Sequence, residues 1–188
     1  MKKVFAQANH IIRLSAACIA AVVTLGIAPQ ALAERQIEAG FGPGTGRLSA
    51  LRLALKGIND AEQQVLIAVH TLSNKAIALA LFKAKERGVN VLVVADKLAN
   101  TGDYSALNEL ADKGVYVRLN DRYASMQSKY IVIDGTDVAL GSFGFAESSD
   151  KKTAENALIL HDAPDIANDY TKNFKKLWNE AQPLAASY

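Results

Sequence analysis

Apolar residues between positions 48 and 119 follow two repeating spacings. Mostly apolar runs of strand length occupy residues 65–69, 89–95 and 115–119. Apolar residues at helical spacing precede and separate these runs, and they are Leu48, Leu51, Leu55 and Ile58, then Ile77, Ala80, Leu81 and Ala84, then Leu107, Leu110 and Ala111. Strands that alternate with helices in this way predict parallel crossovers, with helices on both faces of the sheet.

Polar and glycine residues mark the ends of the predicted helices. Ser73 or Asn74 can cap the second helix, Gly88 can end it, and Asp103 can cap the third. Residues 40–46 read Gly-Phe-Gly-Pro-Gly-Thr-Gly, and this segment predicts a flexible loop that leads into the first helix. It matches neither the GxGxxG pattern after a strand nor a GK[ST] phosphate-binding loop.

The pattern changes after residue 120. Short apolar runs at 129–133 and 138–140 flank Asp-Gly-Thr-Asp at 134–137, which predicts an antiparallel hairpin. A strand at 157–160 precedes a last helix that Pro183 ends, and the apolar stripe of this helix comprises Ile166, Tyr170, Phe174, Leu177 and Trp178. The predicted fold class is α/β, a mixed sheet with helices packed on both faces.

Residues 1–33 have the pattern of a secretory signal. Lys2, Lys3 and Arg13 precede an uncharged run over residues 14–28, and Ala31-Leu32-Ala33 (31–33) offers a cleavage site before Glu34. We therefore expect cleavage there, export to the periplasm or secretion, and one domain over residues 34–188 with no transmembrane segment. An uncleaved anchor is the alternative, although the run is short for a membrane span.

Composition describes an ordinary globular domain. Of the 188 residues, 50% are hydrophobic and 21% are charged, which excludes a disordered chain. The predicted signal holds three of the 21 basic residues and none of the 19 acidic ones, so the remainder is nearly neutral and has no global basic field. It also holds Cys18, the one cysteine, and the remaining histidines, His70 and His161, are not at metal-ligand spacing. We expect no cofactor and no metal.

The candidate chemistry lies between Tyr123 and Asn156. Four residues separate Lys129 from Asp134, and six separate Asp134 from Gly141-Ser142. This spacing resembles HxKxxxxDxxxxxxGSxN, the HKD motif of the phospholipase D superfamily. Further stretches resemble the small plasmid-encoded bacterial endonuclease branch of that superfamily, and they are 65–69, 85–89, 118–121 and 154–156.

The resemblance implies a metal-independent phosphodiesterase. In this superfamily one motif histidine attacks the phosphodiester phosphorus, and a second, from a paired motif, protonates the leaving oxygen. Chains with a single HKD-type motif, as here, pair the two motifs by forming a homodimer with the site at its interface. DNA, RNA and phospholipid all present the same phosphodiester group to such a site.

Two motif positions differ from the superfamily pattern. Gln127 stands where the motif has histidine, and Gly144 stands where it has asparagine. An imidazole titrates near neutrality and can act as nucleophile or acid, whereas a carboxamide does not titrate and its nitrogen lone pair is delocalised. Its NH₂ group can still donate a hydrogen bond to a phosphate oxygen, so binding can persist without turnover.

The resemblance assigns a role to each matched residue. Gln127, Lys129, Ser142 and Glu155 occupy catalytic positions. Lys129 would present its ammonium group to phosphate and Ser142 a hydroxyl donor, while Glu155 resembles the acidic residue that orients the histidine. Strand alternation puts Gln127 and Lys129 on one face. Asp134 falls on the other face at the hairpin turn, so we expect Asp134, like Gly141, to be structural.

Three interpretations follow for the function. The first is an active endonuclease-like phosphodiesterase with a relocated nucleophile, for which His70 at a strand end is the candidate, although a structural role for His70 is the simpler interpretation. The second is an inactive dimeric module that binds a phosphodiester, and the third is a purely structural partner-binding protein. A local basic patch, made of Arg118, Arg122, Lys151 and Lys152, would favour a polyanionic ligand.

Overall fold

The computed structural model describes residues 36–44, 49–101, 106–148 and 152–184. The chain divides after Ala33, and every element below belongs to the unit of residues 34–188. The predicted signal therefore lies outside the described residues, as do Leu48, Asp103 and Lys151. Within the described ranges no helix is long and apolar enough to cross a membrane.

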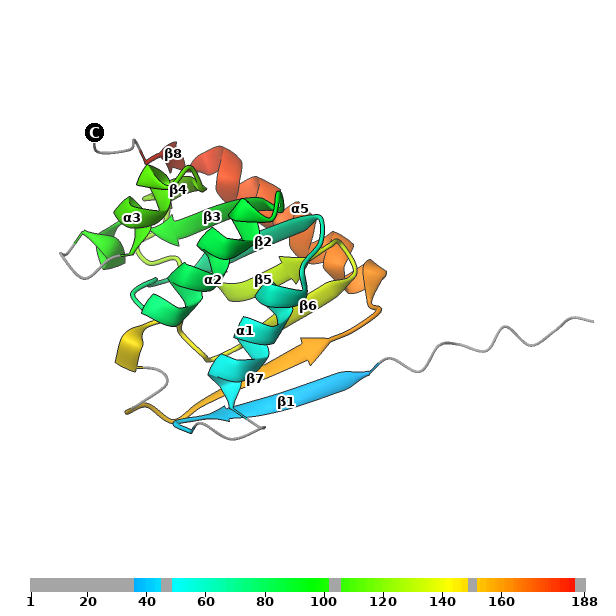
Figure 1. Ribbon diagram of the computed structural model, residues 1–188. Helices are drawn as coiled ribbons and strands as arrows, with labels where there is room; N and C mark the ends of the chain where they lie inside the picture. Colours follow the sequence, from blue (N-terminus) through cyan, green and yellow to red (C-terminus); the bar gives the residue numbers. More distant parts are fainter. Residues whose placement is uncertain (1–35, 45–48, 102–105, 149–151, 185–188) are drawn as a thin grey trace, which may run out of the picture. The chain divides into compact units, whose positions relative to one another are not determined.

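An eight-stranded sheet runs through the described residues in the order β1-β7-β6-β5-β2-β3-β4-β8 (Figure 1). Its strands are β1 (Ile37–Gly42), β2 (Gln64–Val69), β3 (Asn90–Asp96), β4 (Tyr116–Asn120), β5 (Lys129–Ile133), β6 (Asp137–Gly141), β7 (Glu155–Leu160) and β8 (Gln182–Pro183). Strands β2, β3 and β4 pair in parallel, and the other pairings are antiparallel. The predicted mixed sheet is confirmed.

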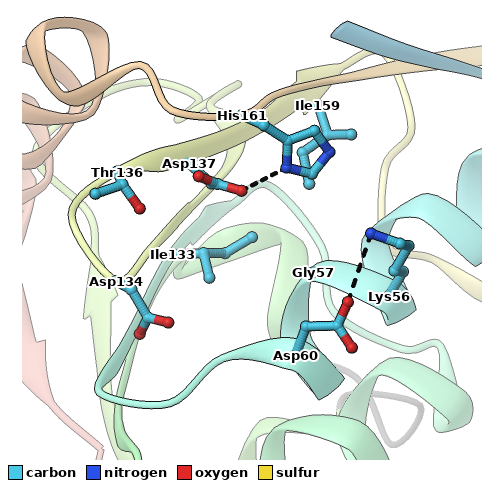
Figure 2. A pocket seen from close by; sticks show the side chains of 9 residues that line it. All are labelled: Lys56, Gly57, Asp60, Ile133, Asp134, Thr136, Asp137, Ile159 and His161. Carbon is cyan, nitrogen blue, oxygen red and sulfur yellow. Dashed lines mark hydrogen bonds and ion pairs between the residues drawn. The ribbon is translucent and has the colours of Figure 1, made fainter. Parts of the chain in front are cut away.

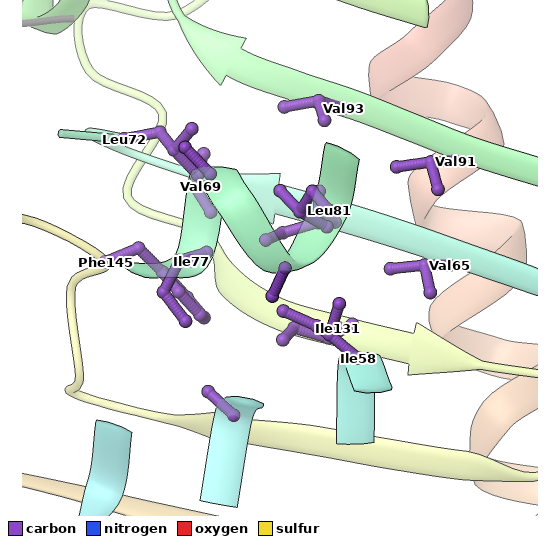
Figure 3. Close-up of a cluster of buried hydrophobic side chains, with 14 of the residues drawn as sticks. Ile58, Val65, Val69, Leu72, Ile77, Leu81, Val91, Val93, Ile131 and Phe145 are labelled. Carbon is purple, nitrogen blue, oxygen red and sulfur yellow. The ribbon is translucent and has the colours of Figure 1, made fainter. Parts of the chain in front are cut away.

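Helices cover both faces of this sheet, as predicted (Figure 1). Helices α1 (Ala50–Asp60), α2 (Lys75–Glu86) and α3 (Leu107–Asp112) share a hydrophobic cluster with one face, while α5 (Pro164–Glu180) packs on the other. A 3₁₀ turn, η1 (Leu98–Asn100), follows β3. Figure 3 shows the larger cluster, in which strand side chains such as Val65, Val91 and Ile131 meet Leu81 of α2.

Strand β5 shows why the central strands are almost entirely apolar. Ile131 and Ile133 join the cluster under α1 and α2, whereas Tyr130 and Val132 join the cluster under α5. Both faces of the strand are therefore buried, and alternation of polar with apolar residues is absent for that reason.

Asn74 is the cap of α2, which decides between the two predicted candidates. Its side-chain oxygen accepts hydrogen bonds from the backbone N–H groups of Ala76 at 3.0 Å and Ile77 at 3.2 Å. Ser49 caps α1 in the same way, accepting from Arg52 N at 3.4 Å. Such contacts satisfy N–H groups that the first helical turn leaves without intrahelical partners.

The predicted loop over residues 40–46 begins too early, because Gly40, Phe41 and Gly42 belong to strand β1 and pair with β7. Pro43 and Gly44 lie outside the strands, and residues 45 and 46 lie outside the described residues. A side-chain carbon on Gly40 would lie 2.8 Å from Leu53 and 2.9 Å from the Ala50 backbone nitrogen. Glycine here permits close packing of β1 against the start of α1. The glycine at position 40 therefore reflects close contact with α1 and not a flexible backbone.

Helix α5 does not cover the whole of its face of the sheet, because strands β7 and β1 lie beyond it. Helix α5 packs over β2 to β6, and on the same face beyond it lie apolar side chains of β1 and β7. Ile37 is 59% exposed, Phe41 58% and Leu158 39%. Leu140 of β6 pairs with Leu158, so the exposed apolar strip continues up to the helix.

Candidate phosphodiester site

The predicted site residues lie where four strands begin or end along one edge of the sheet. Lys129 begins β5 and pairs with Val69, the last residue of β2. Gly141 ends β6, and Glu155 begins β7. The register therefore brings Lys129, Gly141, Ser142 and Glu155 to one edge, although 25 residues separate Lys129 from Glu155 in the sequence.

Lys129 and Gln127 are in direct contact at this edge. The Lys129 ammonium donates to the side-chain oxygen Oε1 of Gln127 at 3.3 Å and to its backbone oxygen at 3.4 Å. The Gln127 side-chain nitrogen Nε2 donates to Ser125 Oγ at 2.6 Å. The Gln127 side chain is exposed, and its carboxamide occupies the motif's histidine position with both polar ends engaged.

Ser142 follows the last residue of β6 and is exposed. Its hydroxyl oxygen accepts a hydrogen bond from the backbone N–H of Asn156 at 3.0 Å. That contact leaves the hydroxyl proton available to donate to a bound anion. Ser142 can therefore act as a donor with its oxygen position fixed by the neighbouring strand.

Gly141 is required by the approach of β7. A side-chain carbon at this position would collide with the backbone oxygen of Asn156 and lie 2.8 Å from Cα of Ala157. The backbone N–H of Phe143 donates to the same Asn156 oxygen at 3.0 Å. The Gly141-Ser142 pair of the motif thus joins the end of β6 closely to the start of β7.

Gly144 lies in the loop after β6, next to a residue that contacts α2. Phe145, at φ 55°, accepts hydrogen bonds through its backbone oxygen from the N–H groups of Ser73 at 3.2 Å and Asn74 at 3.0 Å. The loop that carries the motif's last residues is therefore tied to the N-terminus of α2.

Glu155 lies on the same face as Lys129. Ala157 and Ile159 of β7 join the same hydrophobic cluster as Ile131 and Ile133 of β5. Because side chains two residues apart on a strand point to the same face, Glu155 and Lys129 share the face of that cluster. Glu155 pairs with Gly42 of β1 and is half-buried. The edge thus combines one cation, one carboxylate and two neutral hydrogen-bonding side chains.

Asp134 lies at the other end of β5, about 17 Å of extended strand away from Lys129. Its carboxylate accepts from the backbone N–H groups of Glu62 at 2.9 Å and of Gln63 and Gln64 at 2.8 Å each. Burial raises the pKa of Asp134, but the three N–H donors outweigh it, so that the net pKa is lowered. The carboxylate holds the turn into β2.

A small cavity of about 140 Å³ lies at this opposite end, lined by Asp134, Asp137, His161 and neighbours (Figure 2). His161 Nδ1 lies 2.5 Å from Asp137 Oδ2, and Nε2 lies 2.9 Å from Glu38 Oε1. The hydrogen bond from His161 lowers the pKa of Glu38, burial opposes this, and Lys56 adds to the lowering. His161, in the bend after β7, thus joins Glu38 of β1 to Asp137 of β6. Among the described residues no group of three or more His, Cys, Asp or Glu side chains is placed to hold a metal ion.

His70 follows Val69, the partner of Lys129, and is half-buried. Its backbone oxygen accepts from Asn100 Nδ2 at 2.7 Å. Its ring nitrogen Nδ1 is buried and has no hydrogen-bond partner among the described residues. His70 is therefore adjacent to the motif in the sheet.

Arg118 does not join a basic patch beside Lys129. It lies on β4, separated from β5 by β2 and β3. Its guanidinium donates to the backbone oxygen of Trp178 at 2.9 Å and lies 4.6 Å from the centre of the indole ring. Arg122 and Lys152 are exposed. Arg118 therefore does not belong to the predicted basic patch.

A groove of about 660 Å³ opens beside Lys129 on the α5 side, lined by Ser128, Lys129, Tyr130, Leu140, Gly141, Asp169, Tyr170 and Asn173. Tyr130 donates its hydroxyl to Asn173 Oδ1 at 2.8 Å and meets the Tyr170 ring edge to face at 4.7 Å. Burial and, secondarily, Tyr170 raise the pKa of Tyr130, so its hydroxyl remains a donor. The groove links the motif edge to the exposed apolar strip.

Comparison with known families gives one family-model match, to the PLD-like domain of cardiolipin synthase, over residues 54–178. A phospholipase D of Rickettsia conorii is 32% identical over 117 residues, which are 62% of this chain and 58% of that protein. A mitochondrial cardiolipin hydrolase of Xenopus laevis is 31% identical over 140 residues, 74% of this chain and 66% of the relative. The match thus spans less than two thirds of these relatives.

Solved structures show the same fold. Nuc from Salmonella typhimurium, a phospholipase D family member, superimposes with a TM-score of 0.78 at 29% identity, covering 81% of this chain and all of Nuc. NucT from Helicobacter pylori gives a TM-score of 0.70 at 23% identity, covering 80% of this chain and all of NucT. The sequence-based resemblance and these structural matches point to one superfamily.

Proposed function

Because the chain belongs to the phospholipase D superfamily, we propose that it binds phosphodiesters at the edge around Lys129 and does not hydrolyse them through Gln127. The observation that carries this proposal is the Lys129–Gln127 contact. A carboxamide, already hydrogen-bonded to Lys129 and Ser125, stands where the motif has its nucleophile. The chain would then be a phosphodiesterase-type protein that retains binding and lacks turnover.

The proposed binding mode uses side-chain donors and needs no metal ion. The Lys129 ammonium would lie against one phosphate oxygen, and the Ser142 hydroxyl and the Gln127 NH₂ group would donate to others. Glu155 would have lost the imidazole N–H that the resemblance assigns to it. Asp134 would take no part, since it lies at the other end of β5.

Hydrolysis through a relocated nucleophile is the second candidate, and one observation favours it. The buried Nδ1 of His70 has no hydrogen-bond partner among the described residues, and His70 follows the residue that pairs with Lys129. A neutral imidazole with a free nitrogen can act as nucleophile or base.

We further propose that the chain acts as a homodimer, with the motif edge at the interface. The apolar strip of Ile37, Phe41, Leu140 and Leu158 supports a second copy there, because an exposed apolar patch of this kind marks an interaction site. Lys129 and Leu140 both line the groove, so a second copy seated on the strip would lie beside the edge that carries the motif.

Export to the periplasm, or secretion, is also part of the proposal, with cleavage before Glu34. Its support is the signal-like order of Lys2 and Lys3, the uncharged run and the Ala-x-Ala site. The described unit carries no cysteine, which suits an oxidising compartment.

The test compares the chain from Glu34 with its Gln127→His variant. Hydrolysis of bis(p-nitrophenyl) phosphate and nicking of plasmid DNA are measured in EDTA. We expect turnover only in Gln127→His, because loss of a catalytic nucleophile costs on the order of 10⁶ in kcat. Turnover by the unaltered chain would contradict the proposal, and loss of that turnover in His70→Ala would establish the second candidate.

A further inference from the structure

The connection that delivers the motif to the sheet edge crosses two other strands. Residues 121–128 leave β4 and reach β5, and the sheet order places the ends of β3 and β2 between those strands. Met126 is buried, 3% exposed, and Ser128 is half-buried, while the other residues of this connection are exposed. An exposed connection of eight residues would hold Gln127 and Lys129 loosely unless something anchors it.

Asp96 supplies an anchor next to the motif. It ends β3, midway along the crossing, and is only 2% exposed. Its Oδ2 accepts a hydrogen bond from the backbone N–H of Met126 at 2.7 Å, and its Oδ1 accepts from Ala99 N at 2.8 Å. A buried carboxylate that accepts backbone N–H groups forms strong, short hydrogen bonds. The residue directly after Met126 is Gln127.

Asn100 connects Asp96 to the end of β2, the strand with which Lys129 pairs. Its side-chain nitrogen donates to the backbone oxygens of Asp96 and His70, both at 2.7 Å. Its side-chain oxygen accepts from Leu72 N at 3.0 Å. Asp96, the end of β2 and the motif connection therefore share one buried hydrogen-bond network.

We propose that Asp96 is a positioning residue, which sets the place of Gln127 and Lys129 through the backbone of Met126. The inference rests on the proposed phosphodiester site. In this proposal Asp96 does not contact the ligand, since its carboxylate binds the backbone of Ala99 and Met126. Because a displacement of about 1 Å in a binding or catalytic group can cost on the order of 100-fold, a buried anchor one residue away has a large effect on the site.

Asn120, the last residue of β4, offers a control at the other end of this connection. It is also buried, 1% exposed, and its side-chain oxygen accepts the backbone N–H of Arg122 at 3.0 Å. Truncation of either residue removes a buried acceptor from one end of the connection. Only Asp96 binds a residue next to Gln127. A loss of affinity in both variants would therefore indicate a general loss of stability, and a loss in the Asp96 variant alone would indicate a loss of positioning.

The experiment compares the unaltered full chain with Asp96→Ala and Asn120→Ala. The readouts are the NMR signals of the Gln127 side-chain amide and the affinity for a fluorescein-labelled single-stranded oligothymidylate. We expect Asp96→Ala to shift the Gln127 signals and to lower affinity about tenfold, and Asn120→Ala to change affinity less than about twofold. Asp96→Asn, which keeps one acceptor oxygen, should be intermediate. Equal effects of the two alanine variants would overturn the proposal.

A second measurement needs no variant. The Met126 backbone amide should exchange with solvent far more slowly than the amides of the exposed residues 123–125, and equally fast exchange would overturn the anchor. Lys129→Met separates the two proposals. If it leaves oligothymidylate affinity unchanged, the proposed function fails, while the Gln127 signals still decide the role of Asp96.

Discussion

Lys129 donates from its ammonium group to the Gln127 carboxamide oxygen, 3.3 Å away, within a segment of three residues. Gln127 lies two residues before Lys129, the first residue of β5, so the contact arises from local geometry. The carboxamide is neutral at every accessible pH, unlike an imidazole, and the charge that this pair presents is therefore that of Lys129 alone. The Lys129–Gln127 pair thus offers a phosphate one cation and one neutral donor group, with the Glu155 carboxylate on the neighbouring strand.

Lys129→Met should weaken phosphodiester binding about tenfold or more, because a hydrogen bond to a charged group contributes about 1.5–3 kcal/mol. The substitution keeps the length of the side chain and removes the charge. Binding of labelled oligothymidylate over a range of salt concentrations measures both the affinity and the salt dependence, whose slope should fall by about one. Lys176→Met, at an exposed position of α5, is the control and should change little. Equal losses in both variants would indicate a non-specific charge effect.

Gly141→Ala should destabilise the fold by about 1–3 kcal/mol, because the added carbon would meet backbone atoms of Asn156 and Ala157 that cannot move without disturbing the pairing of β6 with β7. Urea unfolding measures the change. Gly44→Ala is the matched control, since a side-chain carbon there would have only Phe41 O nearby, at 3.9 Å. A Gly141→Ala protein as stable as Gly44→Ala would show that the close approach is absent.

Asp134→Asn should cost about 1–3 kcal/mol at pH 7, since its carboxylate accepts three backbone N–H groups. The folded-state pKa of Asp134 is lowered, so its stabilisation is fully present above the unfolded pKa, about 3.9, and is lost as pH falls through the folded value. The difference between wild type and variant should therefore shrink below about pH 4. Urea unfolding at pH 7 and pH 3 tests this, with Asp60→Asn in the same cavity as the control. A pH-independent difference would refute the explanation.

His161 and Glu38 should be coupled by up to about 1 kcal/mol, the usual range for a partly exposed polar pair. A double-mutant cycle of Glu38→Gln and His161→Asn, followed by thermal unfolding, measures this coupling. The pKa of Glu38 is lowered, so its contribution should persist at neutral pH and disappear in acid, as pH falls through the folded value. Additive single-variant effects at pH 7 would show that the two side chains do not interact.

Phe41→Glu and Leu158→Glu should each convert the proposed dimer into a monomer, because a carboxylate buried in an apolar interface has no compensating partner. Light scattering of the purified chain measures the mass. Leu79→Glu is the control, since Leu79 is 51% exposed on α2, away from the strip, and should leave the mass unchanged. A monomeric unaltered chain would contradict the dimer directly.

The sheet and its two helical layers could be predicted from the sequence because each element is encoded locally. The apolar runs of β2, β3 and β4, the Asp-Gly turn after β5 and the stripe on α5 each lie within one short segment. The spacing of Lys129, Gly141 and Ser142 likewise predicted that they belong to one site, and the register places them at one edge.

Long-range contacts account for what the sequence could not show. Gly40 was misinterpreted because its role is to admit Ala50 and Leu53, which no local pattern reveals. Asp96 and Asn100 follow a strand and resemble any polar loop residues, yet they hold Met126 and the end of β2. Arg118 was grouped with the motif by its proximity in sequence, whereas the sheet order separates them by two strands.

Among the described residues, β7 is the one strand that pairs with β1, in a register that joins Ile37 to Leu160 and Gly42 to Glu155. Apart from a bridge between Phe41 and Ser49, the first strand of the sheet therefore gains its partner strand only after more than a hundred further residues have been synthesised. Pairings of such sequence separation slow folding, because the loop must be closed before the contact is gained. The β1 edge should form late, after β2, β3 and β4 have assembled, and a chain that ends before residue 155 would leave its N-terminal strand unpaired.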